Sequence, residues 1–159
     1  MTNQYDILGE YYVALDSKGR VRLPSSLLKS LGDRDTLKFV VNRGLGNCLT
    51  LWPKPVWDVK KIAVDNLNKF NRRNLQFSRL FYRGATELTP DSADRLLLPK
   101  QLLAYAQADK EIVLSGMNDR IEIWAEAEYE KQFEMDTEAY YDLADEVLGG
   151  SSDTVLPEV

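Results

Sequence analysis

The sequence of 159 residues contains no histidine. Histidine is the commonest general base near neutral pH, so its absence removes the Ser–His and Cys–His nucleophile pairs and a frequent metal ligand. P-loop, GxGxxG, CxxC and HExxH patterns are also missing. A group of glutamates, Glu126, Glu128, Glu130 and Glu134, offers carboxylates, but such a group is more often a solvated helix face than a catalytic or metal site. We therefore expect that the protein is not an enzyme and that it binds neither a cofactor nor a metal.

Cysteine is scarce as well, since Cys48 is the only one. No intrachain disulfide and no multi-cysteine metal site can form, and we expect Cys48 to be a small core or turn residue rather than a redox site. No apolar run approaches the roughly 18 residues that span a bilayer, and the N-terminal segment does not look like a secretory signal. These features favour a cytoplasmic protein with no membrane partner.

The net charge of −5 conceals an uneven distribution. Residues 109 to 159 hold 15 of the 25 acidic residues and three basic ones. Residues 1 to 108 therefore hold 10 acidic and 17 basic residues, a balance of +7 (17 − 10). Nucleic acid responds to local potential rather than to the charge of the whole chain. The N-terminal part of the chain can therefore bind an anionic partner.

One motif occurs twice. Residues 16 to 24 read DSKGRVRLP and residues 91 to 99 read DSADRLLLP, 75 positions later (91 − 16 = 75). In each copy an aspartate precedes an arginine by four residues, which gives the pairs Asp16/Arg20 and Asp91/Arg95. A repeated supersecondary unit predicts a fold built from two copies of one part. A unit of about 45 residues is too small to bury its strands alone, so the two copies must share one core.

The pattern around each motif predicts a strand, a loop, a strand, a short helix and a hairpin. In copy one these are a strand over 11–15, a loop over 16–19, a strand over 20–23, a helix over 25–31, and hairpin strands over 37–41 and 48–52. In copy two the strand over 96–98, the helix over 100–106 and the hairpin strands over 112–114 and 121–124 repeat this order. Two amphipathic helices, near 56–67 and 72–82, connect the copies.

Acidic helices are predicted over 126–134 and 137–148, and Gly149 to Ser152 indicate a disordered tail. We place the first repeat at 5–55, the helical connector at 56–84, the second repeat at 85–133, and the acidic C-terminal helix with its tail at 134–159. The three tryptophans, Trp52, Trp57 and Trp124, are expected to anchor the core.

The two Asp/Arg pairs have two compatible interpretations. In the first, each is an ion pair that pins its loop. In the second, the loops present arginine to an anionic partner, because the planar guanidinium fork matches phosphate oxygens and the O6 and N7 atoms of guanine. The candidate DNA-binding residues are then Lys18, Arg20, Arg22 and Arg95. The candidate loop-orienting residues are Asp16 and Asp91.

The copies differ in charge, which favours copy one as the main DNA contact. From Lys18 to Arg43 there are seven basic and two acidic residues, and Asp94 takes the place that Gly19 has in the first loop. Asp94 could compete for the donors of Arg95 and weaken its contact with phosphate. Alternatively, it could cap the turn and keep Arg95 oriented.

A second basic segment follows the first copy. Arg72, Arg73, Arg79 and Arg83 lie in the connector, where no acidic residue occurs between Asp65 and Glu87. These arginines could contact phosphate. They could equally form a solvated helix face, or contact the acidic helices of a neighbouring subunit.

The chain resembles the MraZ family of bacterial transcription regulators, from about Gly9 to Phe133. The resemblance rests on the segments GEYYVALDSKGRVRLP, FSRLFYRGATELTPDSADRLLLPKQLLAYA and KEIVLSGMNDRIEIWAEAEYE. It implies an α+β fold, a pseudo-two-fold double swapped-hairpin β-barrel of the AbrB/MraZ type flanked by helices. The family's Asp-x-x-x-Arg residues map onto Asp16, Arg20, Asp91 and Arg95. Asp94 departs from the small residue that the family has in this loop.

The resemblance also implies a function. MraZ proteins are expected to form a ring-shaped homo-oligomer, often an octamer, that binds direct repeats in the double-stranded DNA of a promoter. Such a protein would be nucleoid-associated and would usually repress its own division and cell-wall gene cluster. The alternative from another class is a ring-forming assembly module that binds an acidic protein partner instead of DNA.

Overall fold

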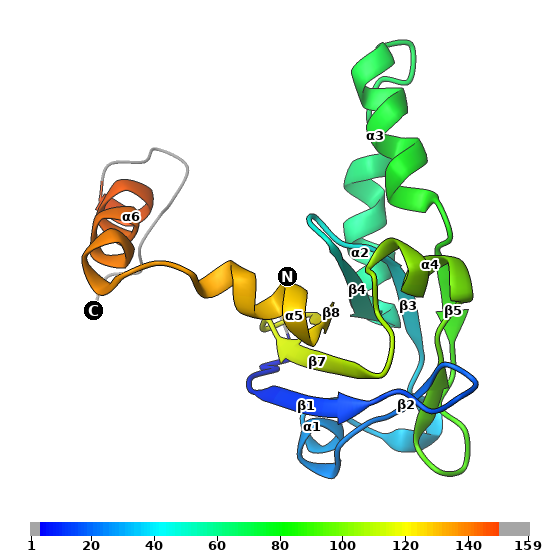
Figure 1. The fold of residues 1–159 in the computed structure, drawn as a ribbon. Helices are drawn as coiled ribbons and strands as arrows, with labels where there is room; N and C mark the ends of the chain where they lie inside the picture. The colour runs from blue at the N-terminus through cyan, green and yellow to red at the C-terminus, as the bar shows by residue number, and fades with distance from the viewer. Residues whose placement is uncertain (1–3, 150–159) are drawn as a thin grey trace. The chain divides into compact units, whose positions relative to one another are not determined.

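The structure, a computed structural model, describes residues 4–149 (Figure 1). These residues fall into two compact units, one that ends at Tyr129 and one that begins at Glu130. The predicted tail begins at Gly149, which the structure still describes, and the rest of that tail lies outside the described residues. No helix within residues 4–149 is long and apolar enough to cross a membrane.

The predicted order of elements is confirmed in both copies. Copy one contains β1 (Glu10–Ala14), β2 (Arg20–Arg22), α1 (Ser25–Lys29), the 3₁₀ helix η1 (Arg34–Thr36), β3 (Phe39–Arg43) and β4 (Cys48–Pro53). Copy two contains β5 (Thr86–Leu88), β6 (Arg95–Leu97), α4 (Lys100–Tyr105), β7 (Glu111–Gly116) and β8 (Ile121–Ala125). Helices α2 (Lys54–Asp65) and α3 (Arg72–Tyr82) connect them, and α5 (Glu126–Glu130), η2 (Lys131–Phe133) and α6 (Thr137–Gly149) follow.

Several element boundaries differ from the prediction, among them those of β3 and α5. The strand expected over 37–41 is β3, which runs to Arg43 because Asn42 and Arg43 pair with Thr50 and Leu49 of β4. The turn therefore starts later than predicted, and η1 occupies the stretch before β3. The helix expected over 126–134 ends earlier, at Glu130, and continues only as the 3₁₀ helix η2.

The strands of the two copies interleave. The main sheet is antiparallel and has the order β1-β7-β8-β4-β3-β5, so β1 of copy one pairs with β7 of copy two, and β5 of copy two pairs with β3 of copy one. Strand β4 pairs with β8 across the middle of the sheet. Strands β2 and β6, which carry the repeated motif, form a separate two-stranded ribbon. The two copies therefore share one core.

The mixed α+β class is confirmed, but the sheet does not close into a barrel. Strands β1 and β5 are the two edges of the six-stranded sheet, and within residues 4–149 no backbone pairing joins them. The β2–β6 ribbon is not hydrogen-bonded to the sheet as a further strand either.

Alternating side chains give the sheet two apolar faces, as a period of two requires. One face packs against the inner side of the ribbon and helices α1 and α4. Its fully buried side chains include Phe39, Val41, Leu49, Leu51, Ile112, Leu114, Ile121 and Ile123. The ribbon contributes Val21 and Leu96, which lie directly opposite each other and are both completely buried. The ribbon thus has one side fixed to the core, and its other side is available for contact.

Trp52 and Trp124 lie on the opposite face of the sheet and Trp57 lies on α2, and all three are buried as expected. Trp52 packs against Trp57 of α2, and the Trp57 ring stacks on Phe81 of α3 with 5.0 Å between the ring centroids. Trp124 packs with Tyr129, together with Cys48. Cys48 is completely buried, and burial raises the pKa of its thiol to about 12, so the residue is a core residue.

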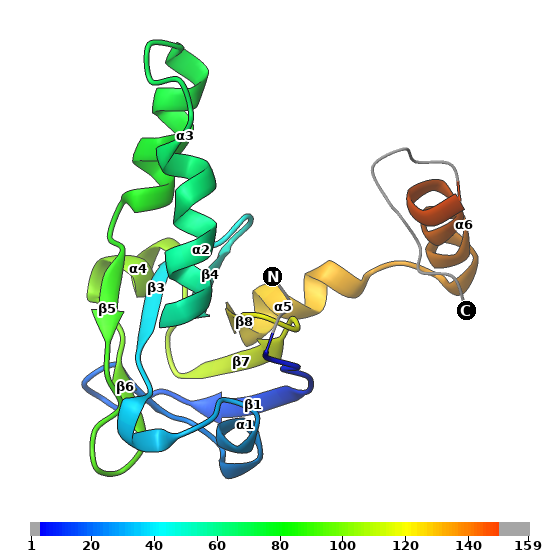
Figure 2. The same cartoon turned by 180° about the vertical axis from the view of Figure 1, so that it is seen from behind.

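The connector helices are joined to the sheet by a short hydrogen-bond chain. The indole Nε1 of Trp52 donates to Asn42 Oδ1 over 2.9 Å, and Asn42 Nδ2 donates to the backbone carbonyl of Phe81 over 3.0 Å. Both views show the α2–α3 pair and the β2–β6 ribbon at opposite ends of the first unit (Figures 1 and 2). The turn that joins α2 to α3 therefore lies at the other end of this unit from the repeated motif.

Candidate nucleic-acid interface

The β2–β6 ribbon collects the predicted site residues on one surface. Arg20 lies opposite Leu97, and Arg22 lies opposite Arg95. Because Val21 and Leu96 point into the core, the residues before and after them point outward. Three arginines and one leucine, from strands about 75 residues apart in sequence, therefore share the outer face of a narrow two-stranded ribbon.

Asp16 organises the first loop through both carboxylate oxygens. Its Oδ1 accepts the backbone N–H groups of Lys18 and Arg20, each over 2.9 Å, and its Oδ2 accepts Nε of Arg20 over 2.6 Å. The Gly19 N–H donates to the Asp16 carbonyl, and the Asp16 N–H donates to the Arg20 carbonyl. The loop and the base of the arginine side chain are thus fixed by one residue.

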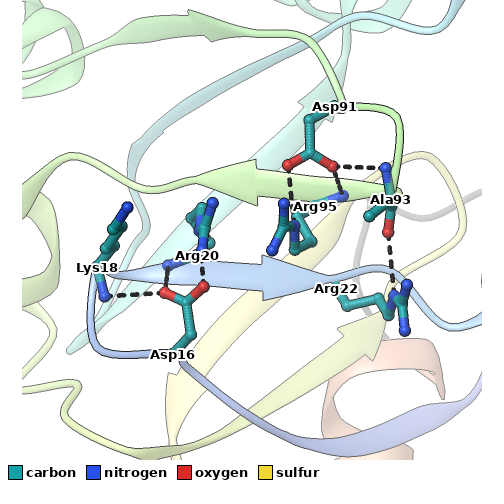
Figure 3. Close-up of polar contacts among 7 residues, drawn as sticks. All are labelled: Asp16, Lys18, Arg20, Arg22, Asp91, Ala93 and Arg95. Carbon is teal, nitrogen blue, oxygen red and sulfur yellow. Dashed lines mark hydrogen bonds and ion pairs between the residues drawn. The ribbon is translucent and has the colours of Figure 1, made fainter.

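Asp91 repeats this arrangement in the second loop. Its Oδ1 accepts the N–H groups of Ala93 and Arg95, each over 2.9 Å, and its Oδ2 accepts Nε of Arg95 over 2.9 Å. Figure 3 shows the two aspartates with Lys18, Arg20, Arg95 and Arg22 following one another along the ribbon. In both copies the aspartate of the repeated motif thus forms an ion pair with the arginine four residues later.

These bonds change the acidity of both aspartates. The backbone N–H of Arg20 is the largest factor that lowers the pKa of Asp16 below its ordinary value of 3.8, and the guanidinium adds to it. The backbone N–H of Arg95 lowers the pKa of Asp91 in the same way. Hydrogen bonds to a carboxylate favour its charged form. Both aspartates therefore stay charged through the whole physiological range and hold their arginines.

The aspartates leave the ends of the arginine side chains available. Within the guanidinium group each aspartate bonds only Nε, and no acceptor for the terminal nitrogens of Arg20 or Arg95 occurs among residues 4–149. The two side chains are 27% and 35% exposed, respectively. Arg22 behaves differently, because its Nε donates to the carbonyl of Ala93 in the opposite loop over 3.0 Å. Within residues 4–149 the terminal nitrogens of Arg22 also lack an acceptor.

The two loops also hold each other in place. The N–H of Leu98 donates to the Gly19 carbonyl over 3.0 Å, and the N–H of Leu23 donates to the Asp94 carbonyl over 2.9 Å. Gly19 and Asp94 occupy equivalent positions with φ of +82° and +61°. Glycine adopts this left-handed region freely, and aspartate tolerates it better than most residues do. The second loop therefore keeps the backbone shape of the first, although it has Asp94 where the first has Gly19.

The comparison with known proteins agrees with this two-copy arrangement. The model of the family described as "MraZ protein, putative antitoxin-like" matches residues 7–77 and 81–147, one match for each half of the chain. The chain belongs to the MraZ family.

Curated members of the MraZ family match most of the chain. "Transcriptional regulator MraZ" of Christiangramia forsetii is 38% identical over 145 residues, which cover 91% of this chain and 94% of the relative. The protein of the same name from Cytophaga hutchinsonii is 39% identical over 142 residues, or 88% and 93% of the two chains. That of Carboxydothermus hydrogenoformans is 36% identical over 141 residues, or 89% and 96%.

The structure corrects one expectation about this MraZ-family chain. We expected Asp94 either to compete for the donors of Arg95 or to keep Arg95 oriented. The Asp94 carboxylate instead accepts a hydrogen bond from the guanidinium of Arg34 in η1, while Arg95 is held by Asp91. Sequence reasoning missed Arg34 because it lies 60 residues before Asp94, and no local pattern connects the two.

The remaining candidates divide into those at the ribbon and those away from it. Lys18 lies in the first loop beside Arg20, and its side chain is exposed. Arg72, Arg73 and Arg79 are exposed on α3, and Arg83 ends that helix, so none of the four belongs to the ribbon. Within residues 4–149 no group of three or more histidine, cysteine, aspartate or glutamate side chains could hold a metal ion.

Proposed function

We propose that this chain is a sequence-specific DNA-binding regulator of transcription, which binds direct repeats in promoter DNA and represses its own division and cell-wall gene cluster. The observation that carries the proposal is the outer face of the β2–β6 ribbon, where Arg20, Arg22 and Arg95 lie side by side. The names of the curated relatives, which describe transcriptional regulators, support the same function.

The ribbon suits the major groove of DNA. That groove is about 12 Å wide and admits a two-stranded β-ribbon. An arginine whose Nε is held by an aspartate still has its two terminal nitrogens directed outward, and these can bond the O6 and N7 atoms of guanine or a phosphate. Asp16 and Asp91 would then orient Arg20 and Arg95, and Lys18 would contact the DNA backbone.

We further propose that the chain acts as a closed ring of identical subunits, with eight as the expected number. Each subunit offers one ribbon, and several ribbons on one assembly would bind successive repeats with much higher affinity than one alone. The exchange of β1 and β5 between the copies supports a double swapped-hairpin architecture. Light scattering should show an oligomer at micromolar concentration, and a stable monomer would contradict this proposal.

A gel-shift titration tests DNA binding directly. The probe is the DNA upstream of the protein's own gene, and the competitor is unrelated DNA of equal length. Binding to the upstream probe should be tighter, and it should weaken steeply between roughly 50 and 200 mM salt, because each cationic contact with phosphate releases counterions. Equal binding to both DNAs would contradict sequence-specific recognition.

The second candidate function is a ring-forming module that binds an acidic protein partner. The exposed basic residues on α3, a helix that does not belong to the ribbon, favour it. An intact chain that forms the oligomer but shows no salt-dependent DNA binding would support this alternative. The DNA-binding proposal places the protein in the cytoplasm at the nucleoid and requires no catalytic step.

A further inference from the structure

We propose that Leu97 is a specificity-determining residue that contacts the 5-methyl group of thymine in the bound DNA. This inference rests on the proposed DNA-binding function and extends it to one base feature. It assigns the two ends of the ribbon different tasks, with a polar contact at Arg22 and an apolar contact at Leu97.

The first observation is a difference between the two copies at one equivalent position. Leu97 stands 75 residues after Arg22 (97 − 22 = 75), the same separation as in the repeated motif. Arg22 reaches across the ribbon and donates to the Ala93 carbonyl in the second loop. Leu97 has no donor with which to make the equivalent bond to Lys18 in the first loop. The two ends of an otherwise symmetric ribbon therefore differ in chemistry.

The second observation is the exposure of Leu97. Its neighbours on β6 and in the following turn, Leu96 and Leu98, are 0% and 1% exposed, whereas Leu97 is 57% exposed. It lies directly opposite Arg20 on the outer face. Because more than half of its side chain is exposed, Leu97 contributes little to the core. An apolar side chain that stands among arginines on an outer face is suited to contact with a partner.

The third observation is the surface around Leu97. A shallow hollow there has Leu88, Leu97 and Pro99 among its lining residues, and three cations, Lys18, Arg20 and Lys100, also line it. No acidic side chain from the described part of the chain lines the hollow. Cations around an apolar surface fit a ligand that combines negative charge with a small apolar group.

Double-stranded DNA has both features where thymine occurs. The cations match the phosphates, and the thymine methyl group is the apolar element that the major groove presents. Apolar side chains recognise that methyl group by direct contact, and the contact carries sequence information because none of the other three bases has a methyl group. Arg20, opposite Leu97, would then bind an adjacent base or phosphate.

The test compares DNA that has the methyl group with DNA that lacks it. The upstream probe is made once with thymine and once with uracil in every thymine position, and wild type, Leu97→Ala and Arg22→Ala are titrated against both. Wild type should bind uracil DNA about fourfold more weakly for each methyl group that it contacts. Leu97→Ala should bind thymine DNA more weakly than wild type and lose the preference for thymine. Arg22→Ala should bind both DNAs more weakly and keep the preference.

The possible outcomes separate this inference from the proposed function. Equal, salt-dependent binding of wild type to both DNAs would overturn the role of Leu97 and leave DNA binding intact. A thymine preference that persists in Leu97→Ala would also overturn it. If wild type binds neither DNA, both proposals are wrong. Because Leu97 is exposed, Leu97→Ala should fold, and an unchanged circular dichroism spectrum checks this.

Discussion

At the scale of single residues, each aspartate of the repeated motif has two tasks. One oxygen of Asp16 binds two backbone N–H groups and shapes the loop, while the other oxygen binds the arginine side chain. The interpretation as a structural ion pair and the interpretation as a presented arginine are therefore not alternatives. The residue that fixes the loop also fixes the direction of Arg20.

The lowered pKa of these aspartates predicts a dependence of stability on pH. A carboxylate whose pKa is lower in the folded than in the unfolded chain stabilises the fold above the unfolded value, and this contribution disappears as pH falls through the folded value. For Asp16 and Asp91 the loss lies below about pH 3.8. Wild type should therefore unfold at a higher temperature than Asp16→Asn or Asp91→Asn at neutral pH, and the difference should shrink below that value.

Calorimetry over a pH series measures this difference. Asp109→Asn is the control, because Asp109 is exposed and lies outside both loops. A gap between wild type and Asp16→Asn that stays constant from neutral to strongly acidic pH would show that the carboxylate charge does not stabilise the loop.

The two arginines held by these aspartates should differ in importance for DNA. Arg20 has Lys18 and the hollow at Leu97 beside it, whereas Arg95 has Ala93 in place of Lys18. We expect Arg20→Ala to weaken specific binding by about 1–3 kcal/mol and Arg95→Ala by less. Titrations at one salt concentration measure both losses.

A matched variant controls for the loss of one positive charge. Lys61→Ala removes a charge from α2, at the other end of the unit, and should leave binding nearly unchanged. Equal losses for Arg20→Ala and Arg95→Ala would contradict the asymmetric interface.

At the scale of elements, the loops and strands of the motif form one rigid piece. The carbonyls of Gly19 and Asp94 each accept an N–H from the strand end of the other copy, and Asp94 is also bonded by Arg34 of η1. Three elements that are distant in sequence therefore meet at the second loop. The first loop has no equivalent side chain, because Gly19 carries none.

This difference predicts the effect of replacing Asp94. Asp94→Gly removes a negative charge from the ribbon edge, frees Arg34 and keeps the left-handed backbone accessible. Non-specific DNA affinity should therefore rise. Asp94→Asn, which also removes the charge but retains a side-chain acceptor, should raise it less, because Arg34 stays partly engaged. Titration with unrelated DNA at fixed salt measures the change, and weaker binding by Asp94→Gly would show that the Asp94 contact with Arg34 supports the interface.

At the scale of the whole molecule, neither half of the chain contains a complete sheet. Each of the pairings β1·β7, β3·β5, β4·β8 and β2·β6 joins the two copies. The turn between α2 and α3 links the halves covalently, and Phe70 in that turn is fully exposed. The strand pairing, rather than this link, holds the two copies together.

A chain divided at this turn should therefore reassemble. We expect residues 1–69 and 70–159, produced together, to copurify as a folded complex, whereas each alone should be largely unfolded. Circular dichroism and size-exclusion chromatography of the single and mixed fragments check this. A folded, monomeric single fragment would contradict the interdependence of the copies.

The sequence predicted the local structure better than the pairing of strands. The repeated DSKGRVRLP and DSADRLLLP segments predicted both loops, and the alternation around Val21 predicted a strand with one buried side. Which strands become neighbours could not be predicted, because alternation shows which face of a strand is apolar and not which strand lies beside it. The Arg34–Asp94 contact and the role proposed for Leu97 likewise depend on that pairing.

The pairing of β1 with β7 also concerns the protein while it is being synthesised. Tyr12 lies opposite Val113, so 101 further residues (113 − 12) must be made before β1 meets its partner. At about 5–20 residues per second the ribosome needs roughly 5–20 s for them. During that time the backbone groups of β1 in the nascent chain are unpaired. Such a strand can be bound by chaperones, and it can pair wrongly with a chain on a neighbouring ribosome.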